Sequence, residues 1–310
     1  MYLKIKAIIK LNNFLLGEIK TQSMIITPNA KDPEVQILAK EFTTRGYKVK
    51  YFIPSELKVG IGFQHEFYKQ FENLEPKAAL VRGFGAAATQ KIFFRLDILR
   101  AIEEYGIKLI NSRESLEIAS DKFLTSVFLE NHHIPTPKTI ICEDPHKALD
   151  AFEDLGGDCV LKPLYGSKGI GITRLNDRAF AENVIYSLGQ LHHVFYLQEF
   201  VEHHNRDIRI LVLGDSVVAG MYRIGNNWKT NIYAGARAEP LEISDELENI
   251  AIKAAQVTKT EIAGVDILES YAGNLVIEVN SIPGFTALQK VTTANLAGEI
   301  VSYYLESVSL

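Results

Sequence analysis

Cysteine and tryptophan are scarce in this sequence, which has two cysteines and one tryptophan among 310 residues. Cys142 and Cys159 lack the spacing of a metal-binding set, and two cysteines are too few for the disulfide framework of a small secreted protein. We expect both to be small core residues in a protein of the reducing cytosol. A free reactive thiol is the alternative.

An excess of positive charge is also absent, because 33 Lys and Arg residues stand against 38 Asp and Glu, a net charge of −5. The overall field of such a chain does not favour nucleic acid or an anionic membrane as a partner. Any polyanionic ligand would have to be held by a local cluster of cations.

Long apolar runs are missing as well, and none approaches the roughly 20 residues needed to cross a bilayer. Near the N-terminus, lysines flank an apolar stretch as in a secretion signal, but Lys10, Asn12 and Asn13 interrupt it and no small-residue cleavage site follows. We therefore do not expect secretion, and we interpret residues 1–23 as an extension with little role in the fold.

Alternating strand and helix patterns fill the rest of the chain, which is 47% hydrophobic and long enough for two globular domains. From Met24 onward the alternation is typical of an open α/β domain, which we predict over residues 24–111. Its predicted segments are strands at 24–27 and 47–53 around a helix near 33–45, then a strand at 78–81, a helix at 92–105 and a strand at 108–110.

A second domain is predicted over residues 112–310. The boundary is placed near residues 111–115, because a capped helix begins at Ser120-Asp121 and ends near Asn131, before prolines that cannot continue it. The later segments are predicted strands at 138–142, 159–162, 172–175, 195–200, 207–212, 217–222, 264–268 and 275–279, and predicted helices at 145–155 and 294–305.

A glycine-rich turn at residues 166–171 joins two of these strands. It is neither a P-loop, which ends in Gly-Lys-Ser/Thr before a helix, nor a dinucleotide-binding fingerprint. Gly166, Gly169 and Gly171 leave the backbone free to approach a ligand, and Ser167 and backbone N–H groups can point at phosphate oxygens. The turn alone is better explained as an ordinary flexible β-turn. Two lysines weigh against that interpretation.

Lys162 ends an apolar strand four residues before the turn, where it either reaches a nucleotide phosphate or extends to solvent. Lys122 begins the capped helix and is equally explained as an exposed first-turn residue, although a cation is unfavourable near a helix N-terminus. The segment Gln198-Glu199-Phe200-Val201 ends a strand and offers backbone groups and an apolar wall to an adenine ring. Asp207 is a candidate partner for ribose hydroxyls, and the alternative is a solvated turn carboxylate.

Three oxygen-bearing side chains form the most informative cluster. Alternation places Glu278 and Asn280 on one face of a strand, and Asp266 lies on the preceding strand, which can pair with it across the turn at 272–274. Without a cation, the two carboxylates would repel each other. Hard oxygen ligands suit Mg²⁺, so we predict a magnesium site in preference to polar residues on a solvated sheet face.

Several basic and amide side chains complete the candidate site. Arg209 and Arg223 lie on predicted strands, whereas Lys229, Asn231 and Arg237 lie in the loop that follows. Each is equally explained as a surface residue, but together with Mg²⁺ they could stabilise the charge that develops as a γ-phosphoryl group moves to a carboxylate.

The order of these motifs resembles the ATP-grasp superfamily, in its ribosomal-protein glutamate ligase-like branch, from about Ala79 to the C-terminus. Six motifs appear in order: Asp121-Lys122, Val160-Leu161-Lys162-Pro163 with the glycine-rich turn, Gln198-Glu199-Phe200-Val201, Asp207-Ile208-Arg209, Gly264-Val265-Asp266-Ile267-Leu268, and Glu278-Val279-Asn280-Ser281-Ile282-Pro283-Gly284. Within that branch, Val81 to Gly85, Phe93 to Asp97 and Trp228 to Asn231 are most similar to the tetrahydromethanopterin:α-L-glutamate ligases.

This resemblance implies an α/β fold, α+β in the catalytic part: a small N-terminal open α/β domain precedes an ATP-grasp domain with a mobile lid at about 137–200. It implies an ATP-dependent carboxylate–amine ligase that adds L-glutamate to a pterin coenzyme through an acyl phosphate, using two Mg²⁺ ions, with Mn²⁺ as a substitute. By this analogy Lys122, Lys162, Glu199, Val201 and Asp207 hold ATP, and Asp266, Glu278 and Asn280 bind the metal. Arg223, Lys229 and Asn231 would face the phosphates, and Arg82, Arg209 and Arg237 are candidate partners for substrate carboxylates.

One segment departs from the family pattern: Ala234-Gly235-Ala236 stands where many members have Arg-Gly-Gly or Gly-Gly. Because this loop approaches the reacting carboxylate, the acceptor could instead be a deazaflavin coenzyme, a protein C-terminus or an amino-group carrier protein. A nucleotide-binding module without turnover is the alternative from another class. The expected partners are small molecules, with neither nucleic acid nor membrane, and a homo-oligomer is possible.

Overall fold

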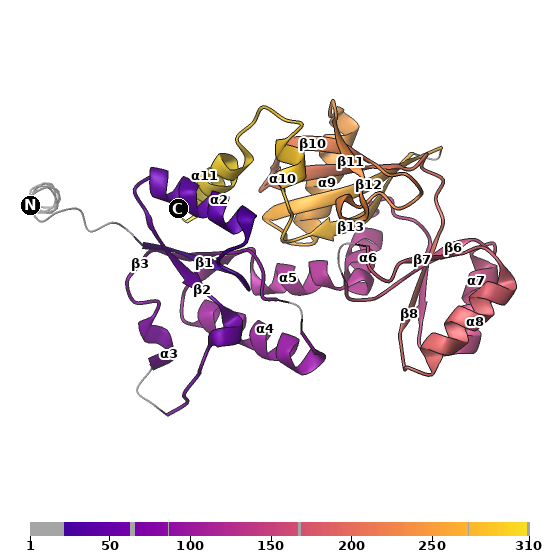
Figure 1. Cartoon of the computed structure of the whole chain (residues 1–310), viewed down its shortest axis with the longest axis horizontal. Helices are drawn as coiled ribbons and strands as arrows, with labels where there is room; N and C mark the ends of the chain where they lie inside the picture. The colour runs from indigo at the N-terminus through magenta and orange to yellow at the C-terminus, as the bar shows by residue number, and fades with distance from the viewer. Residues whose placement is uncertain (1–21, 63–65, 86, 167–168, 272, 309–310) are drawn as a thin grey trace, which may run out of the picture. The chain divides into compact units, whose positions relative to one another are not determined.

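The computed structural model describes residues 22–62, 66–85, 87–166, 169–271 and 273–308 (Figure 1). Two compact units divide the chain, one within Met1–Ile110 and Val301–Leu310 and the other comprising Asn111–Ile300. In the described ranges, no helix combines the length and apolar character needed to cross a membrane.

The first unit contains a parallel four-stranded sheet in the order β2-β1-β3-β4. Its strands are β1 (Gln22–Ile26), β2 (Lys48–Phe52), β3 (Leu74–Val81) and β4 (Lys108–Ile110), and its helical segments are α2 (Pro33–Thr44), η1 (Pro54–Glu56), α3 (Glu66–Lys69) and α4 (Thr89–Glu104). Asp32 caps α2 by accepting hydrogen bonds from the N–H groups of Glu34 and Val35, and Pro33 fits the first helical position. The expected open α/β architecture is confirmed.

The C-terminal helix α11 (Leu296–Ser307) contributes its last residues to the first unit, whereas the sequence predicted that the second domain continues to residue 310. The physical reason is Tyr304, which is fully buried, packs edge-on against Phe42 and donates a hydrogen bond of 2.9 Å to the Ala78 carbonyl of β3. A buried tyrosine needs a partner for its hydroxyl, and β3 supplies it.

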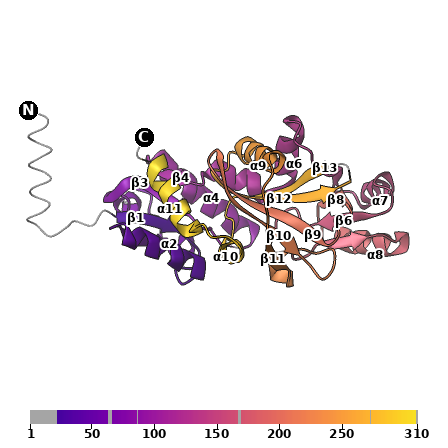
Figure 2. The same cartoon turned by 90° about the horizontal axis from the view of Figure 1, so that it is seen from above.

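The second unit contains an antiparallel five-stranded sheet in the order β11-β10-β9-β12-β13. Its strands are β9 (Arg206–Leu213), β10 (Ser216–Ile224), β11 (Arg237–Pro240), β12 (Ile262–Ser270) and β13 (Gly273–Asn280). Helices α6 (Lys122–Asn131) and α9 (Asp245–Val257) cover one face of this sheet (Figure 2). Apolar residues from the helices and strands form a core on that face, which leaves the opposite face free for polar side chains.

A smaller antiparallel sheet in the same unit has the order β5-β8-β6-β7. It comprises β5 (Thr139–Cys142), β6 (Cys159–Lys162), β7 (Thr173–Leu175) and β8 (Phe195–Glu199), and packs against α7 (Pro145–Asp154) and α8 (Arg178–Gly189) through a second core. The glycine-rich turn therefore joins the paired strands β6 and β7, as predicted. Cys159 is buried in this core, where burial raises the pKa of its thiol to about 12.

The strands of the sequence prediction were found within a few residues, but several elements were missed. Helices α5 (Arg113–Ser120), α8 and α9, the short helices α3 and α10 (Thr286–Gln289), the 3-10 turns η1 and η2 (Ile232–Ala234) and strand β11 were not expected. Asp121 is the N-cap of α6, as predicted, and its carboxylate accepts from the N–H groups of Phe123 and Leu124.

Candidate functional site

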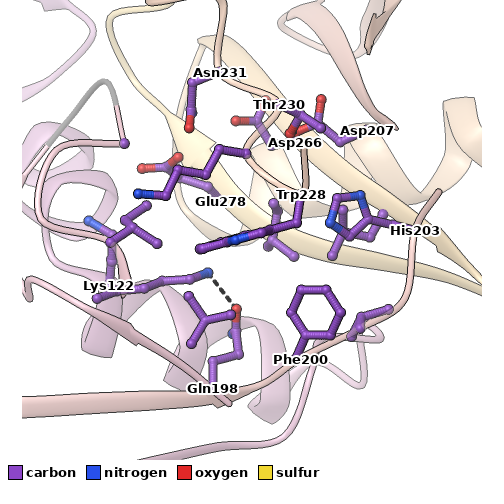
Figure 3. Close-up of a pocket in the computed structure, with 18 of the residues that line it drawn as sticks. Lys122, Gln198, Phe200, His203, Asp207, Trp228, Thr230, Asn231, Asp266 and Glu278 are labelled. Carbon is purple, nitrogen blue, oxygen red and sulfur yellow. Dashed lines mark hydrogen bonds between the residues drawn. The ribbon is translucent and has the colours of Figure 1, made fainter. Parts of the chain in front are cut away.

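A pocket in the second unit gathers most of the residues that the motifs predicted (Figure 3). Its walls come from the polar face of the large sheet, from the small sheet and from the loop after β10. Among the predicted site residues, those that line it are Lys122, Lys162, Gly169, Gln198, Glu199, Phe200, Val201, Asp207, Arg223, Lys229, Asn231, Asp266 and Glu278. Ser167 lies outside the described residues.

A row of charged side chains crosses the large sheet on the pocket side. Arg223 of β10 lies directly opposite Asp207 of β9, and Arg209 of β9 lies opposite Asp266 of β12. Asp266 in turn lies opposite Glu278 of β13. Directly opposed residues of antiparallel strands share a face, so the pairing of four strands brings five charges together.

The first ion pair joins Arg223 and Asp207, which are both buried. Arg223 donates two hydrogen bonds to the Asp207 carboxylate, at 2.7 and 2.6 Å. The Thr230 hydroxyl donates a third, at 2.6 Å. We expected the Asp207 carboxylate to be available to ribose hydroxyls, but in the structure its oxygens already accept from Arg223 and Thr230. A ribose hydroxyl would have to share the Asp207 oxygens with Arg223 and Thr230.

Asp266 forms the second ion pair and is the most buried carboxylate of the row, with 1% of its surface exposed. Arg209 donates to both of its oxygens, and Arg223 reaches one of them at 3.0 Å. Burial alone would raise the pKa of this carboxyl, but the two guanidinium groups hold it below its ordinary value. Burial likewise opposes the charge of Arg223, yet Asp266 and Asp207 outweigh it and raise the arginine pKa.

These ion pairs remove one reason for expecting a metal ion at Asp266. We expected Asp266 to need a metal ion because its charge would otherwise be repelled by Glu278, and the structure shows that two arginines already compensate it. Arg209 and Arg223 are therefore not free cations directed at a phosphate. Local periodicity could not indicate this, because Arg209 and Asp266 are 57 residues apart in the chain.

Glu278 lines the pocket beside this pair and is half-buried. Asn280, two residues further along β13, donates from its amide to the Gly264 carbonyl at 3.2 Å and lies 3.5 Å from an Asp266 oxygen, which leaves its own oxygen for another partner. Among the described residues, no three His, Cys, Asp or Glu side chains gather around one point. A metal here would depend on the Asn280 oxygen and on substrate or water in addition to the carboxylates.

Lys162 faces this acidic side of the pocket from the small sheet. Its ammonium group donates a hydrogen bond of 2.5 Å to the Gln198 side chain, shown as a dashed line in Figure 3. Burial, helped by the neighbouring Lys122, lowers the pKa of Lys162 to about 8, although Glu278 and Asp266 act in the opposite direction. Lys122 donates to the Gly166 carbonyl at 3.3 Å, next to the glycine-rich turn.

Aromatic side chains form the opposite corner. The ring of Phe200 lies 6.1 Å from that of Trp228, edge to face, and 6.0 Å from that of His203. The Arg174 guanidinium lies 3.3 Å from the centroid of the Phe200 ring, and Asp158 holds that arginine by a bidentate ion pair. Phe200 was predicted as an apolar wall, whereas Arg174 and His203 were not predicted, because neither belongs to a recognised motif.

The glycine-rich turn lies against the loop after β10. Gly169 has a φ of +72°, and a side chain there would run into the Asn231 amide. Gly171 has a φ of +80°, and a Cβ would come within 2.8 Å of Pro163. Gly171 does not line the pocket, but its lack of a side chain allows the turn to fold back over β6.

Arg82 and Arg237 do not line the pocket, and neither do Arg209 and Asn280. Arg82 belongs to the first unit, where it is buried and forms an ion pair of 3.1 Å with Glu34. Burial lowers the pKa of Arg82, and Glu34 and Asp32 oppose that effect. Arg237 is exposed on β11 and pairs with Glu239 at 2.8 Å.

The architecture is that of an ATP-grasp ligase. The structure of the ATP-grasp ligase PsnB complexed with a phosphomimetic variant of its minimal precursor, Mg and ADP superposes with a TM-score of 0.69 at 20% identity, covering 93% of this chain and 99% of that one. Residues 119–304 match the model of the RimK-like ATP-grasp domain, and the chain belongs to this family. ATP-grasp ligases use ATP and Mg²⁺.

Two sequence relatives are more specific. The tetrahydromethanopterin:alpha-L-glutamate ligase of Methanocaldococcus jannaschii is 37% identical over 290 residues, which cover 90% of this chain and 96% of that protein. The ligase of the same name from Methanococcus maripaludis is 40% identical over 236 residues, covering 74% and 78%. The resemblance inferred from the motifs and the ligase class are therefore confirmed.

Proposed function

We propose that this protein adds L-glutamate to a carboxylate of a tetrahydromethanopterin-type pterin, in a reaction that consumes ATP. The observation that carries the proposal is the 37% identity to a ligase of that name across 90% of the chain. The pocket supports it, because a lysine pair, an acidic face and an aromatic corner meet there. A nucleoside triphosphate needs the lysines for its phosphates and the aromatic corner for its base, and its metal ion needs the acidic face. We propose that the reaction takes place in the cytoplasm, where both the coenzyme and glutamate would be available.

ATP would lie with its base in the aromatic corner and its phosphates toward the lysines. Phe200 and Trp228 would supply apolar surface for the adenine, and backbone groups of Glu199 and Val201, which line the pocket, would pair with its edge. Lys162 and Lys122 would meet the phosphates, helped by the N–H groups around Gly169. Gln198 holds Lys162 in this direction through the 2.5 Å hydrogen bond.

Glu278 and Asn280 fit Mg²⁺ best, with Asp266 as a further ligand if it releases one arginine contact. All three are oxygen donors, and they lie on neighbouring positions of β12 and β13. We propose that two ions bind and that Mn²⁺ can replace Mg²⁺. When bound, the metal would neutralise phosphate charge and so make the γ-phosphorus easier to attack.

The proposed reaction has two steps. An oxygen of the acceptor carboxylate attacks the γ-phosphorus, the bond to the β-phosphate oxygen breaks, and ADP leaves with an acyl phosphate in the pocket. The glutamate amine then attacks the acyl carbon, forming an amide as phosphate leaves and the amine proton is lost. Lys229 and Asn231 would stabilise the transferring phosphoryl group, with Arg223 contributing charge from beneath.

The hairpin between β6 and β7 would protect the intermediate. An acyl phosphate hydrolyses readily, so water has to be kept out while the amine approaches. The closeness of Gly169 to Asn231 supports a covering role for this turn. Arg82 and Arg237 remain the candidates for holding glutamate carboxylates. The structure assigns both to ion pairs, so a substrate would compete with Glu34 or Glu239.

The test is an acceptor screen. Purified protein, ATP, Mg²⁺ and L-glutamate are incubated with tetrahydromethanopterin-type pterin, a deazaflavin coenzyme, a peptide carboxylate or an amino-group carrier protein, and ADP release is followed. We expect glutamate-dependent release with the pterin and a mass gain of glutamyl residues on it. Release with another acceptor alone would reassign the substrate, and release with none would favour a nucleotide-binding module without turnover.

A further inference from the structure

The loop between β10 and η2, residues 225–231, supplies four consecutive residues to the pocket: Trp228, Lys229, Thr230 and Asn231. It has no regular secondary structure that would hold those side chains in place. Something else must fix its position, because a loop of this length has many accessible conformations and ordering it costs conformational entropy. The structure shows two anchors.

Thr230 is the first anchor. It is 7% exposed, and its hydroxyl donates to Asp207 at 2.6 Å, on the carboxylate oxygen that also accepts from Nη2 of Arg223. Hydrogen bonds to an ionised carboxylate are stronger than neutral ones. Because threonine is branched at Cβ, its side chain has few rotamers, so this bond also restricts the backbone of its two neighbours.

Gly225 is the second anchor, at the other end of the loop. Its N–H donates to the Asn205 carbonyl at 2.8 Å, and a Cβ at this position would run into the carbonyls of Asn227 and Lys229. The Lys229 N–H donates to the Asn227 side chain at 2.8 Å. The loop is thus folded tightly on itself, so a displacement at Thr230 would be passed on to Lys229.

We propose that Thr230 is a positioning residue, whose hydroxyl couples the 225–231 loop to the buried Asp207–Arg223 pair and so holds Lys229 and Asn231 at the pocket. The coupling continues to the glycine-rich turn, because Asn231 occupies the space that a side chain at Gly169 would need. The Asp207–Arg223 pair therefore acts on catalysis through Thr230, in addition to the charge that Arg223 contributes to the pocket. The catalytic part of this inference rests on the proposed function.

The only tryptophan of the whole sequence lies in this loop, which makes the proposal measurable without substrate. We compare acrylamide quenching and emission wavelength of Trp228 in the full chain carrying Thr230→Val, Thr230→Ser or no change. Valine keeps the shape and loses the hydroxyl, whereas serine keeps the hydroxyl. We expect stronger quenching and a red shift for Thr230→Val, and values close to the unchanged protein for Thr230→Ser.

The second readout is the rate of ADP release, measured with the acceptor that the screen described above identifies. Thr230→Val should lower kcat by about tenfold, the loss expected for one charge-assisted hydrogen bond, with a smaller change in the KM for ATP. Thr230→Ser should recover most of that loss. The matched control is Thr258→Val, which removes a buried hydroxyl bonded to the Ala254 carbonyl of α9 and should leave both Trp228 fluorescence and kcat unchanged.

Two results would overturn the proposal. Unchanged Trp228 quenching in folded Thr230→Val would show that the hydroxyl does not hold the loop. Increased quenching with an unchanged kcat would show that loop position does not matter for turnover. Circular dichroism checks the fold, and Thr230→Ala, which lacks the bulk of valine, gives the same test if Thr230→Val does not fold. The fluorescence result stands even if no acceptor supports turnover, so failure of the proposed function is distinguished from failure of this inference.

Discussion

Arg223 and Asp207 face each other across strands β10 and β9 and are joined by two hydrogen bonds in a site where both are almost completely buried. With Arg209 and Asp266 they form a network in which two positive and two negative charges balance. Such a network is neutral as a whole, but each member depends on the others, because a buried charge without its partner is costly.

This dependence predicts a large loss of stability for Arg223→Ala. The change leaves Asp207 without two donors and removes one cation from Asp266, so we expect the free energy of unfolding to fall by about 3–5 kcal/mol. Urea unfolding followed by circular dichroism measures it. Arg237→Ala, which removes an arginine from an exposed ion pair on the neighbouring strand, should cost less than about 1 kcal/mol. Equal effects of the two changes would contradict the role of the buried network.

The lowered pKa of Lys162 predicts that nucleotide binding weakens as the pH rises through about 8. Below that pH the ammonium is charged and attracts phosphate, and above it the free protein must first bind a proton. Calorimetric titration with ADP between about pH 7 and pH 9.5 should show an affinity that falls by up to tenfold per pH unit above the pKa. Lys162→Arg keeps the charge over this range, so a pH profile that this variant shares would count against Lys162 as the titrating group.

Lys162 is also expected to affect stability. Nucleotide affinity should fall as the pH rises, whereas the contribution of Lys162 to stability should increase. Its pKa in the folded protein, about 8, is below its ordinary value of 10.5, so the unfolded chain binds more protons between these pH values. The contribution of Lys162 to the free energy of unfolding therefore rises as the pH increases from about 8 to 10.5 and is constant below that window. Comparing the pH dependence of urea unfolding between the unchanged protein and Lys162→Met isolates this contribution, which is absent if the two profiles are parallel.

Glu278→Gln tests the magnesium site more cleanly than a change at Asp266, whose carboxylate also holds two arginines. Removing one anionic ligand should raise the Mg²⁺ concentration at half-maximal turnover by about tenfold or more, with the melting temperature little changed. Glu269→Gln is the matched control, since this glutamate of β12 pairs with Arg206 and does not line the pocket. An unaltered Mg²⁺ requirement in Glu278→Gln would remove this residue from the site.

Contact between the turn and the loop predicts that Gly169 and Asn231 are energetically coupled. Gly169→Ala places a methyl group where the Asn231 amide lies and also strains a backbone with φ +72°, so turnover should fall by about tenfold. In an Asn231→Ala background, the further loss caused by Gly169→Ala should be smaller. The coupling is measured from kcat/KM of the unchanged protein, the two single variants and the double variant. Gly235→Ala, with φ +94° and no neighbour near the added atom, reports the backbone strain alone. Strictly additive losses at positions 169 and 231 would rule out the contact.

Much of the site was predictable because its residues occur in local patterns. The glycine-rich hairpin was recognised from glycines between two apolar strands, and the pairing of Asp266 with Glu278 followed from strand alternation across a short turn. Helices α8 and α9 were not predicted, although both have capped N-termini. Asp177 and Ser244, their caps, were the available signals.

The amino-acid sequence by itself determined most of the strands and several of the helices, the ATP-grasp motifs and the types of side chain that meet in the pocket, since each depends on residues close together in the chain. Only the tertiary structure decided which charge neutralises which. The order β10-β9-β12 sets Arg223 against Asp207 and Arg209 against Asp266, and Thr230 reaches Asp207 across 23 residues of chain. Sheet order results from the packing of the whole core, and local periodicity carries no information about it.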